Sequence, residues 1–218
     1  MRRKDCRGVP FASELPLSII PSMERHELQE LHYITPICNI PSILQYGILS
    51  YVGVSHIEHR SVAMATVQDR RASVRVPGGR PLHEYVNLYI CARNPMLFKQ
   101  QAEHQTICVL SMSPDVLDLP GVIVTDSNAS SEYVRFAPAP DGLQIVDRDR
   151  TFAEYWTDPD PIQQWRKKAA KCAEVLVPDR VVPRFLVGVY VSCEQARRQV
   201  EAFGLGLPVS IQQHLFFL

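Results

Sequence analysis

The sequence has no excess of either charge. Lys plus Arg and Asp plus Glu number 23 each among 218 residues, which gives a formal net charge of zero. A chain without a bulk positive field has no general attraction for nucleic acid. The signs are nevertheless segregated, with cations concentrated over residues 60–99 and acids over residues 115–160. The charge pattern therefore excludes a wholly basic protein and is compatible with a local groove that binds phosphate.

The sequence also lacks long apolar runs and paired cysteines. No apolar run approaches the roughly 20 residues needed to cross a bilayer, and residues 1–20 contain no continuous apolar stretch of the kind found in signal peptides. The six cysteines are scattered, without a CxxC pair. Scattered cysteines indicate reduced thiols rather than a disulfide scaffold or a zinc site. We therefore expect a cytoplasmic protein that neither crosses a membrane nor binds a metal.

Several nucleotide-binding and hydrolase motifs are missing as well. The chain contains no GxGxxG and no GxxxxGK[ST], so neither a Rossmann dinucleotide site nor a P-loop is supported. It contains no GxSxG and no HExxH. His56 and His59 are three residues apart, but no acidic or thiolate partner stands at metal-ligand spacing.

The pattern of elements that is present predicts a mixed α+β fold. Hydrophobic residues make up 46% of the chain, enough for a sizeable core. Short strands and helices alternate irregularly without a βαβ repeat, which argues against a doubly wound sheet. We predict an N-terminal extension over residues 1–28 and a single domain over residues 29–218. Expected strands are 31–35, 85–90, 106–110, 121–125, 173–177, 185–191 and an edge strand at the C-terminus; expected helices are 22–27 (capped by Ser22), 39–47, 162–171 and 194–203.

The stretch from residue 66 to residue 98 is the most distinctive part of the chain. It contains five arginines against one aspartate and one glutamate, a Pro-Gly-Gly turn at 77–79, and an alternating run over 85–90. Cations beside a glycine-rich turn and an aromatic strand suit an anionic ligand that contains rings. The plainer alternative is a solvated basic loop beside an ordinary strand.

Two polar residues stand inside predicted strands. Glu174 lies in the apolar run Ala173–Val177, and His32 lies between Leu31 and Tyr33. A buried glutamate is rare unless it is paired or functional. The plain alternatives are that Glu174 is the outward residue of an alternating strand and that His32 is a satisfied core histidine.

Short motifs along the chain occur together in one order, and the series resembles the DarT family, the DNA ADP-ribosyltransferase toxins of bacterial toxin–antitoxin systems. The similarity runs from about Leu31 to the C-terminus. Each motif is weak alone, and the ordered set is specific. The series is His32-Tyr33-Ile34-Thr35, Asn39-Ile40-Pro41-Ser42-Ile43-Leu44 with Gly47, Gln68-Asp69-Arg70-Arg71-Ala72, Pro77-Gly78-Gly79 with Leu82-His83-Glu84-Tyr85-Val86, Arg93-Asn94-Pro95-Met96-Leu97, Thr125-Asp126, and Lys171-Cys172-Ala173-Glu174-Val175-Leu176-Val177.

The resemblance implies an ADP-ribosyltransferase-like fold, a split and twisted β-core with NAD in the cleft between its halves. Such an enzyme uses NAD as co-substrate, without a metal, and transfers ADP-ribose to a base in single-stranded DNA. The expected partners are single-stranded DNA and a macrodomain antitoxin of the DarG kind, and we expect a monomer. The implied residues are His32, Thr35, Asn39, Arg71 and Tyr89 for NAD, Arg71 and Glu174 for catalysis, and Arg75, Arg93, Met96 and Tyr133 on the acceptor side.

The chemistry agrees with these implied roles. Cleavage of the nicotinamide–ribose bond builds oxocarbenium-like charge, which a carboxylate such as that of Glu174 stabilises while it orients the sugar. Arg71 has too high a pKa to act as a simple base, so we favour electrostatic stabilisation of the attacking base, although the family's arginine is assigned a direct part in its deprotonation.

The sequence departs from the family pattern on the acceptor side. Tyr133 stands where a histidine of the substrate loop is expected, and residues 86–89 and 92–95 also differ from the usual runs. These departures leave the acceptor open. Thymine is favoured, and the alternatives are guanine, RNA, or a catalytically silent module that binds nucleic acid or an antitoxin. The presence of both Arg71 and Glu174 argues against a silent module.

Overall fold

The computed structural model describes residues 22–218. The predicted extension over residues 1–28 lies mostly outside this range, so the boundary at residue 28 stays a prediction. Within the described part, Met23 and Leu28 are buried in the main core together with strands of the central sheet. The predicted helix there is a single 3₁₀ turn, Arg25–Glu27, and its N-cap is Glu24 rather than Ser22, because Glu24 and Glu27 form a reciprocal capping box.

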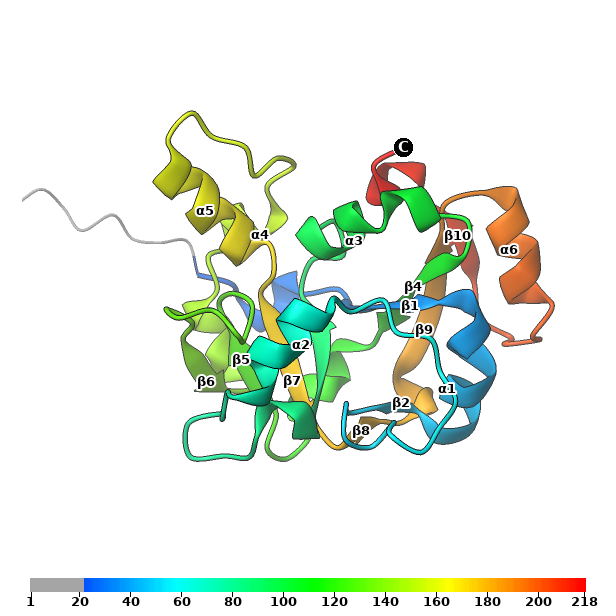
Figure 1. Ribbon diagram of the computed structural model, residues 1–218, viewed down its shortest axis with the longest axis horizontal. Coiled ribbons are helices and arrows are strands. Elements are labelled where there is room, and N and C mark those ends of the chain that lie inside the picture. Colours follow the sequence, from blue (N-terminus) through cyan, green and yellow to red (C-terminus); the bar gives the residue numbers. More distant parts are fainter. Residues whose placement is uncertain (1–21) are drawn as a thin grey trace, which may run out of the picture.

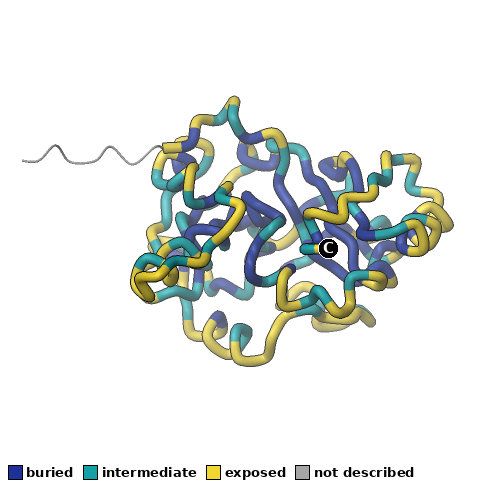
Figure 2. Tube along the Cα trace, turned by 90° about the horizontal axis from the view of Figure 1, so that it is seen from above, coloured by how far each residue is buried: buried dark blue, intermediate teal, exposed yellow. Residues whose placement is uncertain are grey.

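An eight-stranded, largely antiparallel sheet runs through the domain in the order β10-β9-β4-β1-β3-β7-β5-β6, and β2 and β8 form a separate pair (Figure 1). The strands are β1 (Leu31–Pro36), β2 (Ile48–Leu49), β3 (Tyr85–Tyr89), β4 (Ile107–Met112), β5 (Ile123–Thr125), β6 (Phe136–Pro138), β7 (Glu174–Pro178), β8 (Arg180–Val181), β9 (Leu186–Val191) and β10 (Val209–Ile211). Buried chain runs through the middle of the molecule, and exposed loops surround it (Figure 2). The predicted α+β class is confirmed.

Helices cover the sheet and its ends. They are α1 (Ile40–Tyr46), α2 (Ala65–Ala72), α3 (Pro95–Lys99), α4 (Arg148–Phe152), α5 (Pro161–Ala170) and α6 (Glu194–Glu201). Short 3₁₀ turns lie at Ile37–Asn39, Leu82–Glu84, Gln101–Glu103, Pro114–Asp118, Asp141–Ile145, Pro183–Phe185 and Gln213–Phe216. Helix α1 ends at Gly47 as predicted. There a positive φ of 84° and the close approach of the Val181 carbonyl leave no room for a Cβ atom.

The sheet is divided between β1 and β3. These two strands share one register pair, His32 with Tyr89, whereas β1 pairs with β4 over its whole length and β3 pairs with β7 over its whole length. The strands therefore diverge at this junction, and β5, β6 and β7 lie to one side of it with β4, β9 and β10 on the other (Figure 1). This arrangement is the split β-core that was predicted.

Two further features differ from the sequence-based expectation. Helix α2 was not predicted, since its stretch of sequence resembles a basic loop. Arg71 is the only buried residue of that helix, and no apolar periodicity marks it. The C-terminal edge strand β10 ends at Ile211, and the chain closes with a 3₁₀ turn that buries Phe216 in a second core cluster with Ile34 and Tyr89.

Candidate active site

A cavity of about 470 Å³ lies at the division of the sheet. Its wall contains residues of β1 and β3, helices α1, α2, α3 and α5, and the segments 57–64 and 128–131. Pockets that hold cofactor-sized molecules commonly have volumes of about 300–1,000 Å³. The two halves of the sheet and the helices around it thus enclose a space large enough for a dinucleotide or a large part of one.

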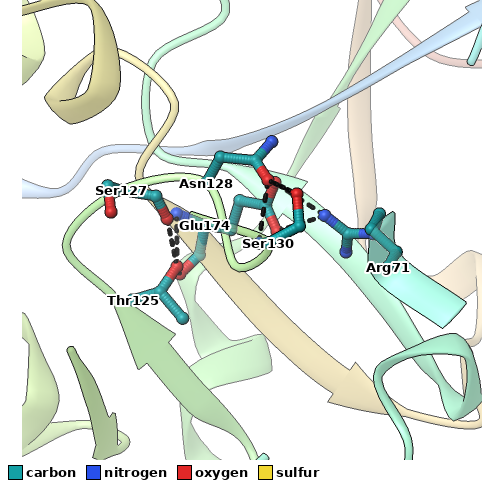
Figure 3. Close-up of polar contacts among 6 residues, drawn as sticks. All are labelled: Arg71, Thr125, Ser127, Asn128, Ser130 and Glu174. Atoms are coloured by element: carbon teal, nitrogen blue, oxygen red, sulfur yellow. Dashed lines mark hydrogen bonds and ion pairs between the residues drawn. The ribbon is translucent and has the colours of Figure 1, made fainter. Parts of the chain in front are cut away.

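A buried ion pair stands at the wall of this cavity. Arg71 on α2 lines the cavity, and its Nη1 donates to both carboxylate oxygens of Glu174 at 3.1 Å (Figure 3). Glu174 begins β7, the strand between β3 and β5, where it faces Tyr89 on one side and Thr125 on the other. Glu174 is fully buried and Arg71 nearly so. The alternative that Glu174 points outward from its strand is therefore wrong.

The loop after β5 fixes the backbone at Glu174. The Thr125 hydroxyl accepts a hydrogen bond from the Glu174 N–H at 3.2 Å and donates to the Ser127 carbonyl at 2.7 Å (Figure 3). Asn128 Oδ1 accepts from the backbone N–H and from the hydroxyl of Ser130. Asn128 and Ser130 also line the cavity. This loop joins the carboxylate to the cavity wall.

The pKa values of the groups around the ion pair are shifted by burial. Burial raises the pKa of Glu174, and the adjacent Arg71 guanidinium opposes that shift. Burial and then the charge of Glu174 hold the pKa of Tyr89 well above its ordinary value. Burial and then Arg71 lower the pKa of His83. Tyr89 and His83 therefore present neutral groups near the ion pair at neutral pH.

The predicted NAD-binding residues do not all reach the cavity. Thr35, Asn39, Arg71 and Tyr89 line it. Asn39 does not cap α1 with its side chain; instead its Nδ2 donates to Thr35 Oγ1 at 3.1 Å and to the Arg60 carbonyl at 2.8 Å. His32 does not belong to the cavity wall. It is buried with Nε2 at 3.1 Å from Glu30 Oε1.

The predicted acceptor-side residues are dispersed. Met96 on α3 lines the cavity. Tyr133 is 77% exposed and meets Trp165 edge to face. Arg93 instead donates to the carbonyls of Glu154 and His214 and stands over the Phe217 ring. Arg75 donates to the Gly79 carbonyl in the Pro-Gly-Gly turn.

Four cavity residues were not singled out from the sequence. Gln68 Oε1 and His83 Nε2 are buried without a hydrogen-bond partner among residues 22–218, and both residues belong to the cavity wall. Unpaired polar atoms in such a wall are candidates for ligand contacts. Trp165 and Lys168 on α5 also line the cavity. The sequence feature that could have identified these two residues as part of a binding surface is a tryptophan followed directly by three cations.

Two absences hold for the described part of the chain. Within residues 22–218, no three His, Cys, Asp or Glu side chains gather closely enough to hold a metal ion. No helix in the same range combines the length and apolar character needed to span a membrane.

Comparisons with known proteins give a consistent result. The family described as "ssDNA thymidine ADP-ribosyltransferase, DarT" matches residues 32–217. A DNA ADP-ribosyl transferase–DNA ADP-ribosyl glycohydrolase fusion protein of Thermosipho africanus is 31% identical over 87% of this chain and 50% of its own length. A DNA ADP-ribosyl transferase of Thermus sp. is 32% identical over 65% of this chain and 72% of its own length. The chain thus spans about half the length of the fusion protein.

Solved structures show the same likeness. Thermosipho africanus DarTG in complex with ADP-ribose superposes with a TM-score of 0.76 at 28% identity, over 87% of this chain and 51% of that one. Thermus sp. 2.9 DarT in complex with ADP-ribosylated ssDNA gives a TM-score of 0.75 at 26% identity, over 87% of this chain and 96% of that one. Thermus sp. 2.9 DarT has also been solved with NAD⁺, and there the TM-score is 0.71 at 25% identity.

Proposed function

Because the chain belongs to the DarT family of single-stranded-DNA thymidine ADP-ribosyltransferases and has its fold, we propose that it transfers ADP-ribose from NAD to a thymidine base in single-stranded DNA. The observation that carries the proposal is the buried Arg71–Glu174 pair at the wall of a dinucleotide-sized cavity. Burying an ion pair gives weak stability at best, so a function is the better reason for this one.

In the proposed reaction, the bond between nicotinamide and the ribose C1′ breaks, and its electron pair leaves with the nicotinamide. A ring nitrogen of the base bonds to C1′, and the proton of that nitrogen is released to the solvent. Glu174 faces the positive charge that develops on the ribose, and it accepts a hydrogen bond from a ribose hydroxyl. The protein contributes a carboxylate that is rigidly positioned and already desolvated, and whose oxygens can accept further hydrogen bonds.

Arg71 has a second role in this proposal. One guanidinium nitrogen holds Glu174, and the other nitrogens remain for the NAD diphosphate or for the negative charge on the attacking base. Arg71 acts through its charge, because a guanidinium stays protonated in proteins and is a poor proton acceptor. Thr35, Asn39 and Tyr89 complete the NAD wall, and Met96 lies toward the acceptor.

His32 and the remaining arginines take supporting roles in the proposal. His32 bonds to Glu30 and holds the start of β1, whose later residues line the cavity. Arg93 fastens the C-terminal turn to the segment before α5, and Arg75 supports the Pro-Gly-Gly turn. These three residues position the walls of the site.

The partner in the cell is proposed from the relatives. The Thermosipho protein joins a DNA ADP-ribosyl transferase to a DNA ADP-ribosyl glycohydrolase. We assign to this chain a toxin role in the cytoplasm, opposed by a macrodomain glycohydrolase that removes the ADP-ribose. Adding such a glycohydrolase to modified DNA should restore the mass of the unmodified oligonucleotide.

The test is to incubate the protein with NAD and a panel of oligonucleotides and to weigh the products. Each oligonucleotide carries one kind of reactive base, as a single strand, as a duplex, or as RNA. We expect one ADP-ribosyl group on thymidine in the single strand and much slower reaction in the duplex, because base pairing hides the ring nitrogen. Modification of guanine alone or of RNA alone would overturn the acceptor assignment. Equal rates on duplex and single strand would overturn the mechanism.

A further inference from the structure

Two exposed aromatic rings meet at the edge of the cavity. Trp165 on α5 is 50% exposed and Tyr133 is 77% exposed. Their ring centroids lie 6.1 Å apart, and the rings are nearly perpendicular at 87°. The loop that carries Tyr133 is closed by Arg135, whose backbone N–H and Nε donate to the Asp126 carboxylate. Core packing does not explain this pair, since large aromatic side chains are otherwise buried where a protein can bury them.

The cations of α5 divide into two kinds. Lys167 forms an ion pair with Asp158 at 2.7 Å, so its charge is neutralised within the protein. Arg166 and Lys168 have no carboxylate within ion-pair distance among residues 22–218, and both are exposed. Lys168 and Trp165 stand three residues apart, which puts them on one face of the helix. Both belong to the cavity wall.

We propose that Trp165 and Lys168 on α5, together with Tyr133, form a docking strip for the single strand next to the acceptor base. A flanking base stacks on the Trp165 ring, Tyr133 closes one side of that ring, and Lys168 contacts a phosphate. The acceptor base itself must go deeper, to the Arg71–Glu174 pair. The half-exposed ring of Trp165 is thus left for a neighbouring base.

This inference rests on the proposed function, and it names the surface by which the enzyme would select its substrate. An aromatic face beside a lysine that has no acidic partner among residues 22–218 is better suited to nucleic acid than to an apolar protein surface, because it offers both stacking and a phosphate contact. The Thermus relative with TM-score 0.75 was solved with ADP-ribosylated ssDNA. A strip of this kind favours single strands, whose bases are free to leave the stack.

The two tryptophans of the chain allow a direct test. Trp156 packs edge to face against Phe98 and Phe217, each at 5.7 Å between centroids, and serves as the internal control. In Trp156→Phe the fluorescence comes from Trp165 alone, and in Trp165→Phe from Trp156 alone. We expect titration with a single-stranded oligothymidylate, without NAD, to quench the first variant in a saturable way and to leave the second almost unchanged. Equal quenching of both, quenching of Trp156 alone, or no quenching in either would overturn the proposal.

A kinetic arm separates this inference from the function on which it rests. Trp165→Ala should raise the KM for the oligonucleotide about 10-fold or more and lower kcat much less, and Trp165→Phe should change the KM less. Lys168→Gln should flatten the dependence of binding on salt. The matched control is Gln163→Ala, on the same helix but two residues from Trp165 and so on a different face, which should behave as the unmodified protein. If transfer proceeds with an unchanged KM in Trp165→Ala, the docking strip is wrong and the function stands. If no oligonucleotide is modified by the unmodified protein, the function fails, and the titration, which needs no NAD, still reports on the strip.

Discussion

Two carboxylates of the same sheet have opposite surroundings. Glu174 on β7 is fully buried, and in the described structure its only side-chain partner is one nitrogen of Arg71. Glu30, just before β1, accepts hydrogen bonds from the Ser111 hydroxyl and from the Tyr190 hydroxyl, with His32 Nε2 at 3.1 Å. Burial raises the pKa of Glu174. Burial also acts to raise the pKa of Glu30, but the hydrogen bonds from His32, Ser111 and Tyr190 overcome it and lower the pKa to about 2.

The difference lies in the number of side chains that interact with each carboxylate, which is three for Glu30 and one for Glu174. Glu30 is satisfied by side chains of three adjacent strands, β1, β4 and β9, so it braces that half of the sheet. Glu174 keeps unused hydrogen-bonding capacity and reaches the cavity through a residue that lines it. A buried carboxylate with unused acceptor sites is ready to accept a ligand hydroxyl. The comparison supports the role proposed for Glu174 in the reaction, and it indicates that Glu30 stabilises the fold.

The largest effect is expected from Glu174→Ala. Removing the carboxylate should lower the rate of transfer by about 10³-fold or more, because its interaction with the ribose is strongest in the transition state. The Kd for NAD should change only a few-fold. Oligonucleotide mass after timed reaction gives the rate, and calorimetry gives the Kd. Near-normal transfer in this variant would show that another group carries the chemistry.

Arg71→Ala should have the largest effect on stability. It leaves Glu174 buried without its cation, and breaking a buried pair from one side costs about 3–5 kcal/mol. The double variant Arg71→Ala/Glu174→Gln should recover part of that loss, since the uncompensated charge is gone. Urea unfolding of the unmodified protein, of Arg71→Ala, of Glu174→Gln and of the double variant gives the coupling energy between the two side chains. Simple additivity would mean that the pair does not interact as the structure indicates.

Thr125→Val should give an intermediate effect. The change keeps the shape of the side chain and removes the hydroxyl that bonds the Glu174 N–H and the Ser127 carbonyl. Because those two buried groups lose a partner, we expect a loss of about 1–3 kcal/mol in unfolding free energy. Transfer should fall several-fold through misplacement of Glu174. Thr125→Ser retains the hydroxyl and is the matched control, and it should restore most of both quantities.

Glu30→Gln should have the smallest effect at neutral pH and a characteristic effect in acid. The folded pKa of about 2 lies below the ordinary value of 4.5. The stabilisation is therefore complete above pH 4.5 and is lost as the pH falls from 4.5 toward 2. The side chain is 26% exposed, so we expect about 1 kcal/mol after allowing for solvent screening. Acid unfolding midpoints in the unmodified and variant proteins measure it. A variant with the same acid profile as the unmodified protein would contradict the role of Glu30 as a brace.

Much of the fold could be predicted from local signals. Apolar runs such as Ala173–Val177 and residues 106–110 mark strands by composition alone, and Pro41 with Gly47 marks both ends of α1. Helix α2 could not be predicted in this way, because its buried residue is an arginine whose partner is 103 positions away in the sequence. The contact that fixes the position of this helix is tertiary, so no local pattern in the sequence reports it.

The residues of the candidate site also fall into those that the sequence indicates and those that only the fold reveals. Arg71 and Glu174 were found by the ordered motifs, and their contact required the fold. The sequence motif places Arg93 beside the cavity. In the structure its guanidinium instead donates to two backbone carbonyls and lies over the Phe217 ring. Trp165 was missed because α5 reads as an ordinary surface helix, and only the sheet division brings it to the cavity. The sequence motifs therefore led to the ion pair, whereas the composition of the cavity wall required the fold.

The most direct test of the account measures the initial rate of oligonucleotide modification in Glu174→Gln and Glu30→Gln, side by side with NAD and a thymidine-containing single strand. Both changes replace a carboxylate by an amide of nearly the same shape. The account predicts that product formation collapses in Glu174→Gln and stays within about threefold of normal in Glu30→Gln, as expected if only the first carboxylate meets the transition state. Comparable rates in the two variants, or a collapse confined to Glu30→Gln in a protein of normal stability, would contradict it.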